Sequence, residues 1–393
     1  MRNRSVSVVI LVAALCVTSL IPHGAGADQP PLRVGWIATF SGGYTTASKE
    51  GDAAIAAFMK EHGDSVAGRK LEIVKRDDGG LAPDTAKRLA QELIIGEKVD
   101  FLMGITYSPN AMAIGNLSTT AKKPLLITNG AANGLLAPNP YFSRFSYTEG
   151  QLTHALAQWA LKNNIKTVYM AYLDFATGID AADGFQTAYT AGGGKILGDV
   201  RIPVNATDFS AYVQRIKDAK PQAVFVFLTV SGGPFLKAWV SAGGPQSGMK
   251  ILGTGDMTNE ANLPAFGDNA LGVITAMNYS ASHSSQLNAQ LTRDMHAADP
   301  SIDVPDFGAV ATYDALQAIY KIVAAQNGGT DPDKAMALLK GMKFESPRGP
   351  IQIDPQTRDI IENIYIRRVD KVGERYQNTE IATFPMVKDP LEK

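Results

Sequence analysis

Six points of the sequence carry clusters of hydroxyl-bearing and small residues, each directly after a short apolar run. The clusters occupy residues 41–43, 106–108, 129–131, 174–177, 229–232 and 254–256. A glycine or hydroxyl loop that enters a helix offers free backbone N–H groups and the positive end of the helix dipole, which suits a carboxylate. Any single cluster reads equally well as a turn or a helix cap, because the same residue types are favoured there. Together, the six clusters predict one shared, non-covalent binding site.

Enzyme signatures are missing from the same sequence. It has no G-x-S-x-G nucleophile elbow and no G-x-x-x-x-G-K-[ST] phosphate loop, and "GTGDMT" lacks the third glycine of a dinucleotide fingerprint. His62, His154, His283 and His296 are scattered without H-E-x-x-H spacing. The single cysteine, Cys16, lies in the N-terminal segment described below, which excludes thiol catalysis and cysteine metal sites in the exported chain. We expect no enzyme activity, no cofactor and no metal.

The elements that must position these loops alternate along the chain. Strands are expected at residues 32–39, 70–75, 99–104, 125–128, 167–171, 196–202, 223–228, 250–253 and 273–276. Intervening segments such as "GDAAIAAFMKEHG" and "PDTAKRLAQELI" repeat apolar residues every three and four positions, as amphipathic helices do. Continuous apolar strands such as "AVFVFL" favour a parallel sheet covered on both faces. The fold class is therefore α/β and doubly wound, with ligands bound outside the carboxyl ends of the strands. Residues 344–370 instead predict an antiparallel hairpin.

The N-terminus reads as a targeting segment. Arg2 and Arg4 precede an apolar run at residues 8–21, and "AGA" at 25–27 has the small-x-small form of a signal-peptidase site. The run is shorter than the roughly 20 residues of a membrane span. We expect cleavage after Ala27 and a periplasmic protein.

The charge balance bears on the class of partner. Losing Arg2 and Arg4 moves the formal net charge from −1 to about −3, which argues against nucleic acid or an anionic membrane as partner. The remaining length predicts two domains.

Longer segments, in order, resemble the leucine/isoleucine/valine-binding family of periplasmic solute-binding proteins of ABC transporters, which have the type I fold. These segments are "RVGWIATFSGG", "GRKLEIVKRDDGGLAPDTAKRLAQELI", "VDFLMGI", "AKPQAVFVFL", "FGAVATYDALQAIYKIV" and "PRGPIQID". The resemblance implies two Rossmann-like lobes joined by three hinge crossings, near residues 147–149, 277–279 and 348–350. After a signal peptide at 1–27, lobe 1 is expected at 28–147 plus 279–347, and lobe 2 at 148–278 plus 348–393.

The resemblance also implies which loops of each lobe contact the ligand, and two tyrosines beside these loops are added for their position. The expected residues of lobe 1 are Ser41, Gly42, Tyr44, Thr106, Tyr107, Ser108, Asn129, Gly130 and Ala131. Those expected in lobe 2 are Tyr172, Asp174, Phe175, Thr177, Thr229, Ser231 and Asp256. Phe307, just before the "ATYDAL" segment, matches a position that often packs on the ligand side chain in the family.

Two features of the expected site leave its ligand open. Amino-acid binders of the family carry a hydroxyl near Ala131 or Ala132, and both are alanine here. Asp256, in contrast, takes the place of an acid that pairs with the ammonium group in those binders, or is a turn residue. Aromatic side chains suit a flat apolar ligand, and five fall on or beside the loops: Tyr44, Tyr107, Tyr172, Phe175 and Phe307. An aromatic acid and a hydrophobic or branched-chain amino acid both remain candidates.

The resemblance further implies a role and a partner. A monomer would capture a small carboxylate by hinge closure and deliver it to the membrane permease of an ABC importer. The alternative is a binding protein of the same fold that signals to a receptor. The sequence excludes neither.

Overall fold

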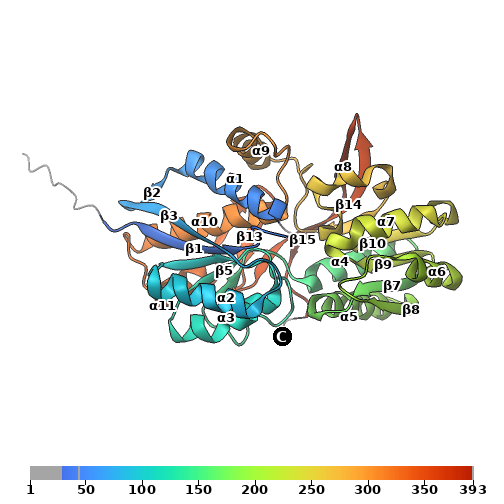
Figure 1. Cartoon of the computed structure of the whole chain (residues 1–393), viewed down its shortest axis with the longest axis horizontal. Coiled ribbons are helices and arrows are strands. Elements are labelled where there is room, and N and C mark those ends of the chain that lie inside the picture. Colours follow the sequence, from blue (N-terminus) through green and yellow to red (C-terminus); the bar gives the residue numbers. More distant parts are fainter. Residues whose placement is uncertain (1–28, 43–44, 392–393) are drawn as a thin grey trace, which may run out of the picture.

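Two lobes lie side by side in the computed structural model, each a β-sheet with helices on both faces (Figure 1). The structure describes residues 29–42 and 45–391. The expected signal peptide and Tyr44 lie outside the described residues. The doubly wound α/β class predicted from the sequence is confirmed.

The sheet of the first lobe has six strands in the order β2-β3-β1-β4-β5-β6. Every neighbouring pair is parallel except β2 with β3. The strands are β1 (Leu32–Ala38), β2 (Ser65–Val66), β3 (Arg69–Asp77), β4 (Phe101–Gly104), β5 (Leu125–Ile127) and β6 (Phe142–Arg144). Four lie where the sequence predicts strands, and β2 and β6 were not predicted.

Helices cover both faces of this sheet because the residues of its strands alternate between two apolar clusters. In β1, Trp36 belongs to a cluster with Phe58, and Ile37 belongs to a second cluster with Leu89. The first face is covered by α1 (Thr45–His62) and α10 (Phe307–Ala325), and the second by α2 (Pro83–Gln91) and α3 (Ser108–Thr120). Two further helices, α9 (Gln286–Ala298) and α11 (Pro332–Leu339), lie outside α1 and α10.

The sheet of the second lobe continues into the C-terminal hairpins, in the order β12-β13-β14-β11-β10-β9-β7-β8, with β15 paired to β14. Its parallel strands are β7 (Thr167–Leu173), β8 (Lys195–Ile202), β9 (Ala223–Phe227), β10 (Lys250–Thr254) and β11 (Ile274–Met277). Its antiparallel strands are β12 (Lys343–Ser346), β13 (Gly349–Ile353), β14 (Ile360–Val372) and β15 (Arg375–Val387). The antiparallel segment predicted at 344–370 is present, and β15 was not predicted.

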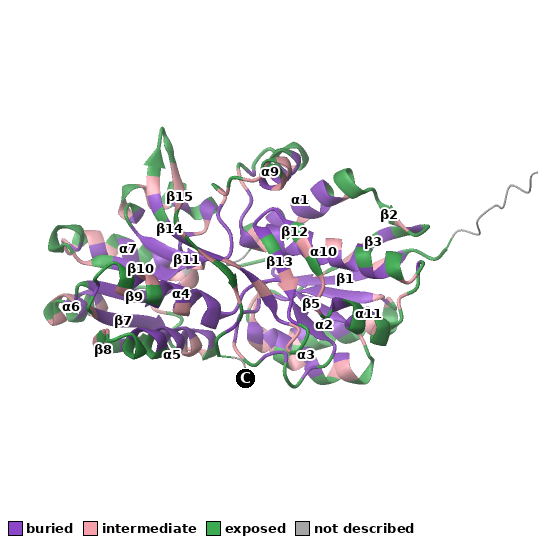
Figure 2. Ribbon diagram, turned by 180° about the vertical axis from the view of Figure 1, so that it is seen from behind, coloured by how far each residue is buried: buried purple, intermediate pink, exposed green. Residues whose placement is uncertain are grey.

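Four longer helices and one short helix complete this lobe. One face is covered by α4 (Glu149–Lys162) and α5 (Ala176–Ala191), the other by α6 (Ser210–Ala219), α7 (Gly232–Ser241) and the short α8 (Leu263–Phe266). Figure 2 shows that the buried residues follow the strands and inner helix faces of both lobes, while the outer helix faces are exposed. The carboxyl ends of the parallel strands in both sheets face the region between the lobes, and helices cover both faces of each sheet.

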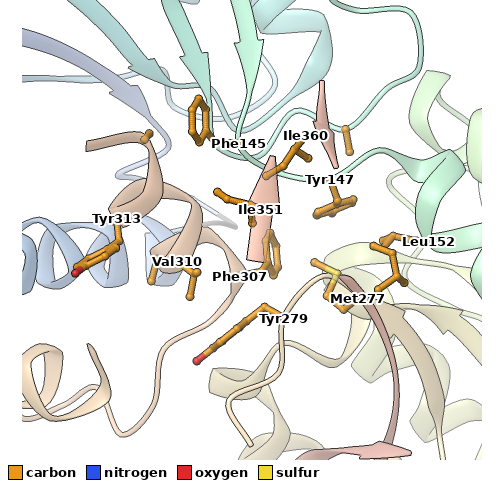
Figure 3. Packing of buried hydrophobic residues seen from close by; sticks show 14 of the residues in the cluster. Phe145, Tyr147, Leu152, Met277, Tyr279, Phe307, Val310, Tyr313, Ile351 and Ile360 are labelled. Carbon is orange, nitrogen blue, oxygen red and sulfur yellow. The ribbon is translucent and has the colours of Figure 1, made fainter. Parts of the chain in front are cut away.

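Buried apolar and charged groups join the two lobes. Tyr147, Met277 and Phe307 lie together where the chain passes between the lobes (Figure 3). Two buried arginines add ion pairs: Arg144 Nε lies 2.6 Å from an Asp359 oxygen, and Arg348 lies 2.8 Å from Asp314 and 3.0 Å from Glu362. Separating these buried groups would leave polar atoms without partners, so the contacts hold the crossing segments together.

The segment expected to hold the third crossing contacts both lobes, because the Arg348 side chain donates to Phe145 O over 2.7 Å in the first lobe and lies 3.0 Å from Glu362 in the second. The Arg358 side chain donates to the backbone oxygens of Phe142 and Leu136 in the first lobe, and its own carbonyl accepts from the backbone N–H of Arg144. β14, which begins at residue 360, pairs with β11 of the second lobe. We therefore propose that the chain finally enters the second lobe after residue 359, and that β12 and β13 belong to the first lobe although they pair into the second sheet.

Candidate ligand-binding site

A cavity of about 270 Å³ lies between the lobes, at the carboxyl ends of strands from both sheets. Ten of the residues expected from the sequence line it: Thr106, Tyr107, Ser108, Asn129, Ala131, Phe175, Thr177, Thr229, Ser231 and Asp256. Six further residues complete the lining: Leu81, Tyr147, Glu149, Leu173, Val204 and Phe227.

The residues that follow β4 and β9, at the start of two loops that line the cavity, have unusual backbone conformations. Ile105, after β4, has φ 70°, and Thr229, after β9, has φ 44°. The left-handed region is unfavourable for β-branched residues, and such strain is typical of functional sites. Ile105 is held there because its N–H donates to Ile37 O (2.8 Å) and its carbonyl accepts from Gly130 N–H (3.1 Å). These bonds fix the direction in which Thr106 and its neighbours leave the sheet.

A buried network orients the first-lobe loop. Thr39 Oγ1 donates to Asp78 Oδ1 over 2.7 Å and lies 3.1 Å from Thr106 Oγ1, while Asn110 Nδ2 donates to the other Asp78 oxygen over 2.9 Å. Asp78 thus ties the ends of β1, β3 and β4 to the start of α3. The loop at Thr106 is pre-organised before a ligand arrives.

The N-termini of α3 and α5 both face the cavity. Ser108 is the first residue of α3, and neither Tyr107 nor Phe175 caps its helix with a side chain. Ser108 Oγ accepts from Ala132 N–H over 3.0 Å, so its own proton remains available to a ligand. Thr177 brings a second hydroxyl at the start of α5. Hydroxyls and helix N-termini make this part of the lining suited to an anion.

Two acids stand in another part of the lining. Glu149, the first residue of α4, is 1% exposed, and burial, followed by the charges of Asp256 and Asp180, raises its carboxyl pKa well above the usual value, against the opposing effect of Arg144. Burial also raises the pKa of Asp256, which accepts from Thr254 Oγ1 over 2.7 Å. Both carboxyl groups therefore favour the neutral form more than exposed acids do.

Four aromatic residues also line the cavity. Phe175 and Phe227 lie 5.9 Å apart between ring centroids and are tilted by 50°. Tyr107 and Tyr147 come from the first lobe and the first crossing. Phe307, which was expected to contact the ligand, does not line the cavity: it is 2% exposed and packs edge-on behind Tyr147 at 5.7 Å.

Five other expected residues do not line this cavity either. Ser41 is exposed and its hydroxyl donates to Asp77 over 2.7 Å, so the loop with Gly42 turns toward the end of β3. Gly130 packs behind Ser108 and donates its N–H to Ile105.

The remaining two lie on β7 and just after it. Tyr172 points into the core cluster and its hydroxyl donates to Asp199 over 3.0 Å, because alternate strand residues face opposite sides. Asp174 has a half-exposed side chain 3.7 Å from Arg201.

Six lining residues were not predicted from the sequence, and only some of them have a sequence feature that could have identified them. Tyr147 and Glu149 fall in the segment expected to be the first crossing, which borders any cleft between two lobes. Leu173 and Phe227 are the last residues of their strands, so strand ends alone pointed to them. Leu81 and Val204 are half-exposed loop residues without a recognisable pattern.

Among residues 29–42 and 45–391, no three His, Cys, Asp or Glu side chains are grouped so as to hold a metal ion. No helix within that same part of the chain has the length and apolar character needed to cross a bilayer. The site is thus built from hydroxyls, helix N-termini, two acids and aromatic rings.

Comparison with known proteins gives a consistent result. The sequence profile of the periplasmic binding protein family matches residues 31–374. Leu/Ile/Val-binding protein homolog 6 of Brucella abortus (strain 2308) is 39% identical over 386 residues, covering 97% of this chain and 98% of that protein.

Two solved structures are similar over 92% of this chain and 99% of their own. The solute-binding protein of an ABC transporter from Rhodopseudomonas palustris BisB5, in complex with 3,4-dihydroxybenzoic acid, has 41% identity and a TM-score of 0.87. A solute-binding protein of an ABC transporter from R. palustris, in complex with 4-hydroxybenzoate, has 37% identity and a TM-score of 0.89.

Proposed function

The chain belongs to the periplasmic binding protein family and is the substrate-binding component of an ABC importer, not an enzyme, and from this premise we propose that its ligand is an aromatic carboxylate. The observation that carries the proposal is the cavity between the lobes, with aromatic rings on its walls and two helix N-termini at its edge. Relatives of 37% and 41% identity bind hydroxylated benzoic acids, which supports the same class of ligand here.

The size of the cavity fits a single substituted ring. An apolar protein cavity of about 150 Å³ accommodates benzene, so about 270 Å³ leaves room for a ring with small substituents. Tyr107, Phe175 and Phe227 offer faces and edges to such a ring, which favours offset or edge-on packing. The ligand carboxylate is placed at Ser108 and the start of α3, where a hydroxyl proton and the helix N-terminus meet it.

A hydrophobic amino acid is the second candidate, because Glu149 and Asp256 could together pair with an ammonium group. Two observations favour the aromatic acid over it. Ala131 and Ala132 bring no hydroxyl to the place where an α-amino acid is held. Burial also disfavours the charged carboxylates that an ammonium group requires.

Capture is proposed to occur by closure of the two lobes about the crossings. Residues from both lobes line the cavity, so a ligand held by Ser108 gains contacts with Phe175 and Ser231 only when the lobes meet. A ligand shifts such an equilibrium only through its differential affinity for the two forms. Moving a closed-to-open ratio of 1:99 to 99:1 would take about 5.5 kcal/mol of differential affinity from the second-lobe contacts.

The periplasm is the location of the family, and a small ligand and an ABC permease are its partners. Beyond this, we propose that the signal peptide is cleaved after Ala27, that the protein acts as a monomer, and that it binds no nucleic acid. A net charge of about −3 after cleavage supports the last point.

A thermal-shift screen tests the ligand class. The mature protein, unfolded and refolded to remove bound ligand, is heated with benzoate, 4-hydroxybenzoate, cyclohexanecarboxylate, leucine and phenylalanine. A ligand at 100 times its Kd stabilises the folded state by about 2.7 kcal/mol, enough to raise the Tm measurably. Stabilisation by the benzoates but not by cyclohexanecarboxylate is expected. Stabilisation by the amino acids alone would refute the proposal and assign the acid pair to an ammonium group.

A further inference from the structure

Glu149 differs from the other lining residues because one of its carboxylate oxygens has nothing to bind. Within the described chain, Oε2 of Glu149 is buried and has no hydrogen-bond partner. The residue is 1% exposed, so solvent does not compensate. Leaving a buried polar oxygen unsatisfied is costly, and such groups are normally paired. Because Glu149 lines the cavity, this oxygen is placed where a ligand could supply the missing partner.

Neighbouring groups are committed elsewhere. Arg144 makes an ion pair with Asp359 at 2.6 Å and donates to the backbone oxygens of Tyr147 (3.3 Å) and Ala132 (2.9 Å). Asp180 accepts from Asn133 N–H over 3.1 Å, and as a second acid it offers Glu149 no attraction. The position of Glu149 itself is fixed, because its backbone N–H donates to Ala131 O over 3.2 Å at the start of α4.

We propose that Glu149 accepts a hydrogen bond from a ring hydroxyl of the ligand and thereby selects hydroxylated aromatic carboxylates over unsubstituted ones. This inference rests on the proposed function and deepens it. Asp256 stands in the same part of the lining, whereas the hydroxyls and helix N-termini that favour an anion lie at the starts of α3 and α5. The carboxylate therefore takes Ser108 and the start of α3, and the ring turns its hydrogen-bond donor toward Glu149.

Asp256 differs from Glu149 in the same cavity. Its Oδ1 already accepts from Thr254 Oγ1, which is only two residues away. One of its oxygens is therefore already engaged, while Glu149 offers an acceptor that has no partner within the described chain. A buried site that hydrogen-bonds a ligand hydroxyl discriminates strongly against the analogue that lacks it, because the protein group is then left unpaired.

The test compares the affinities of two ligands for four proteins by titration calorimetry. The ligands are 4-hydroxybenzoate and benzoate; the proteins are the wild type, Glu149→Met, Glu149→Gln and the control Asp180→Asn. Methionine keeps the volume and the unbranched shape but removes both acceptors, whereas glutamine keeps one. Asp180→Asn removes a nearby acid that does not line the cavity.

The wild type and Asp180→Asn are expected to prefer 4-hydroxybenzoate by about ten- to one-hundred-fold, the range of one buried hydrogen bond. Glu149→Met should lose that preference while binding benzoate at least as well, and Glu149→Gln should keep more of it than Glu149→Met. An equal loss of affinity for both ligands in the Glu149 variants, or an unchanged preference, overturns the role of Glu149 alone. Failure of both ligands to bind the wild type overturns the proposed function and this inference together.

Discussion

The hydroxyl of Ser108 gives the most direct test of where the ligand carboxylate binds. Ser108→Ala removes the donor placed against the ligand carboxylate and leaves the Ala132 N–H, 3.0 Å away, without its acceptor. A hydrogen bond to a charged group contributes about 1.5–3 kcal/mol, so the Kd should rise about ten- to one-hundred-fold. The orphaned N–H should also cost about 1–3 kcal/mol of folding stability. Titration calorimetry measures the first effect and denaturant unfolding the second.

Ser118 provides a matched control in the same helix. It is buried like Ser108, and its hydroxyl donates to Lys123 O over 2.6 Å, away from the cavity. Ser118→Ala should therefore lower stability by a similar amount and leave the Kd unchanged. Two results would refute the reasoning: a Kd for Ser108→Ala within twofold of wild type, or an equal loss of affinity in Ser118→Ala. The second would mean that any loosening of α3 weakens binding.

Two further predictions concern the aromatic wall and the pH. Phe175→Ala should weaken binding of the aromatic carboxylate about tenfold, because ring packing against the ligand is lost. Tyr172→Phe should leave the Kd unchanged, because the Tyr172 hydroxyl binds Asp199 and not the ligand. Titration calorimetry of both variants measures these effects. Burial raises the pKa of Glu260 to about 7 and that of Glu362 to about 8, from 4.5. The folded state thus holds protons that the unfolded state releases. The free energy of unfolding should therefore fall as the pH rises from about 4.5 to 8, by up to about 1.4 kcal/mol per pH unit for each group, and the Tm should fall with it. Glu260→Gln should flatten the slope below pH 7; a Tm that rises over this range would contradict the assignment.

The parallel part of both sheets could be predicted from the sequence because strands buried on both faces are continuous apolar runs. The nine expected strands all appear within a few residues of their predicted bounds. β6, only three residues long, and β15, an antiparallel strand with mixed burial, lack that signal. Short length and one-sided burial leave no run long enough to distinguish from a loop.

The loops of the site could be predicted for a different reason, namely that the strand ends of a doubly wound sheet meet at a crevice. What the sequence does not contain is the direction of each side chain. Ser41 stands at a strand end, yet it binds Asp77 instead of facing the cavity. Glu149 lines the cavity from a crossing, where the sequence shows only a helix start. Such directions depend on contacts between residues far apart in the chain.

The packing of α10 against α1 bears on when the protein acquires its fold. Tyr313 of α10 bonds both His62 (2.9 Å) and Glu61 (2.6 Å) of α1, across 251 and 252 residues of chain. One face of the first sheet is therefore covered only in part, by α1, until α10 has been made. Contacts of such high sequence separation form slowly. The core of the first lobe therefore cannot be completed before α10, which ends at residue 325, has been synthesised.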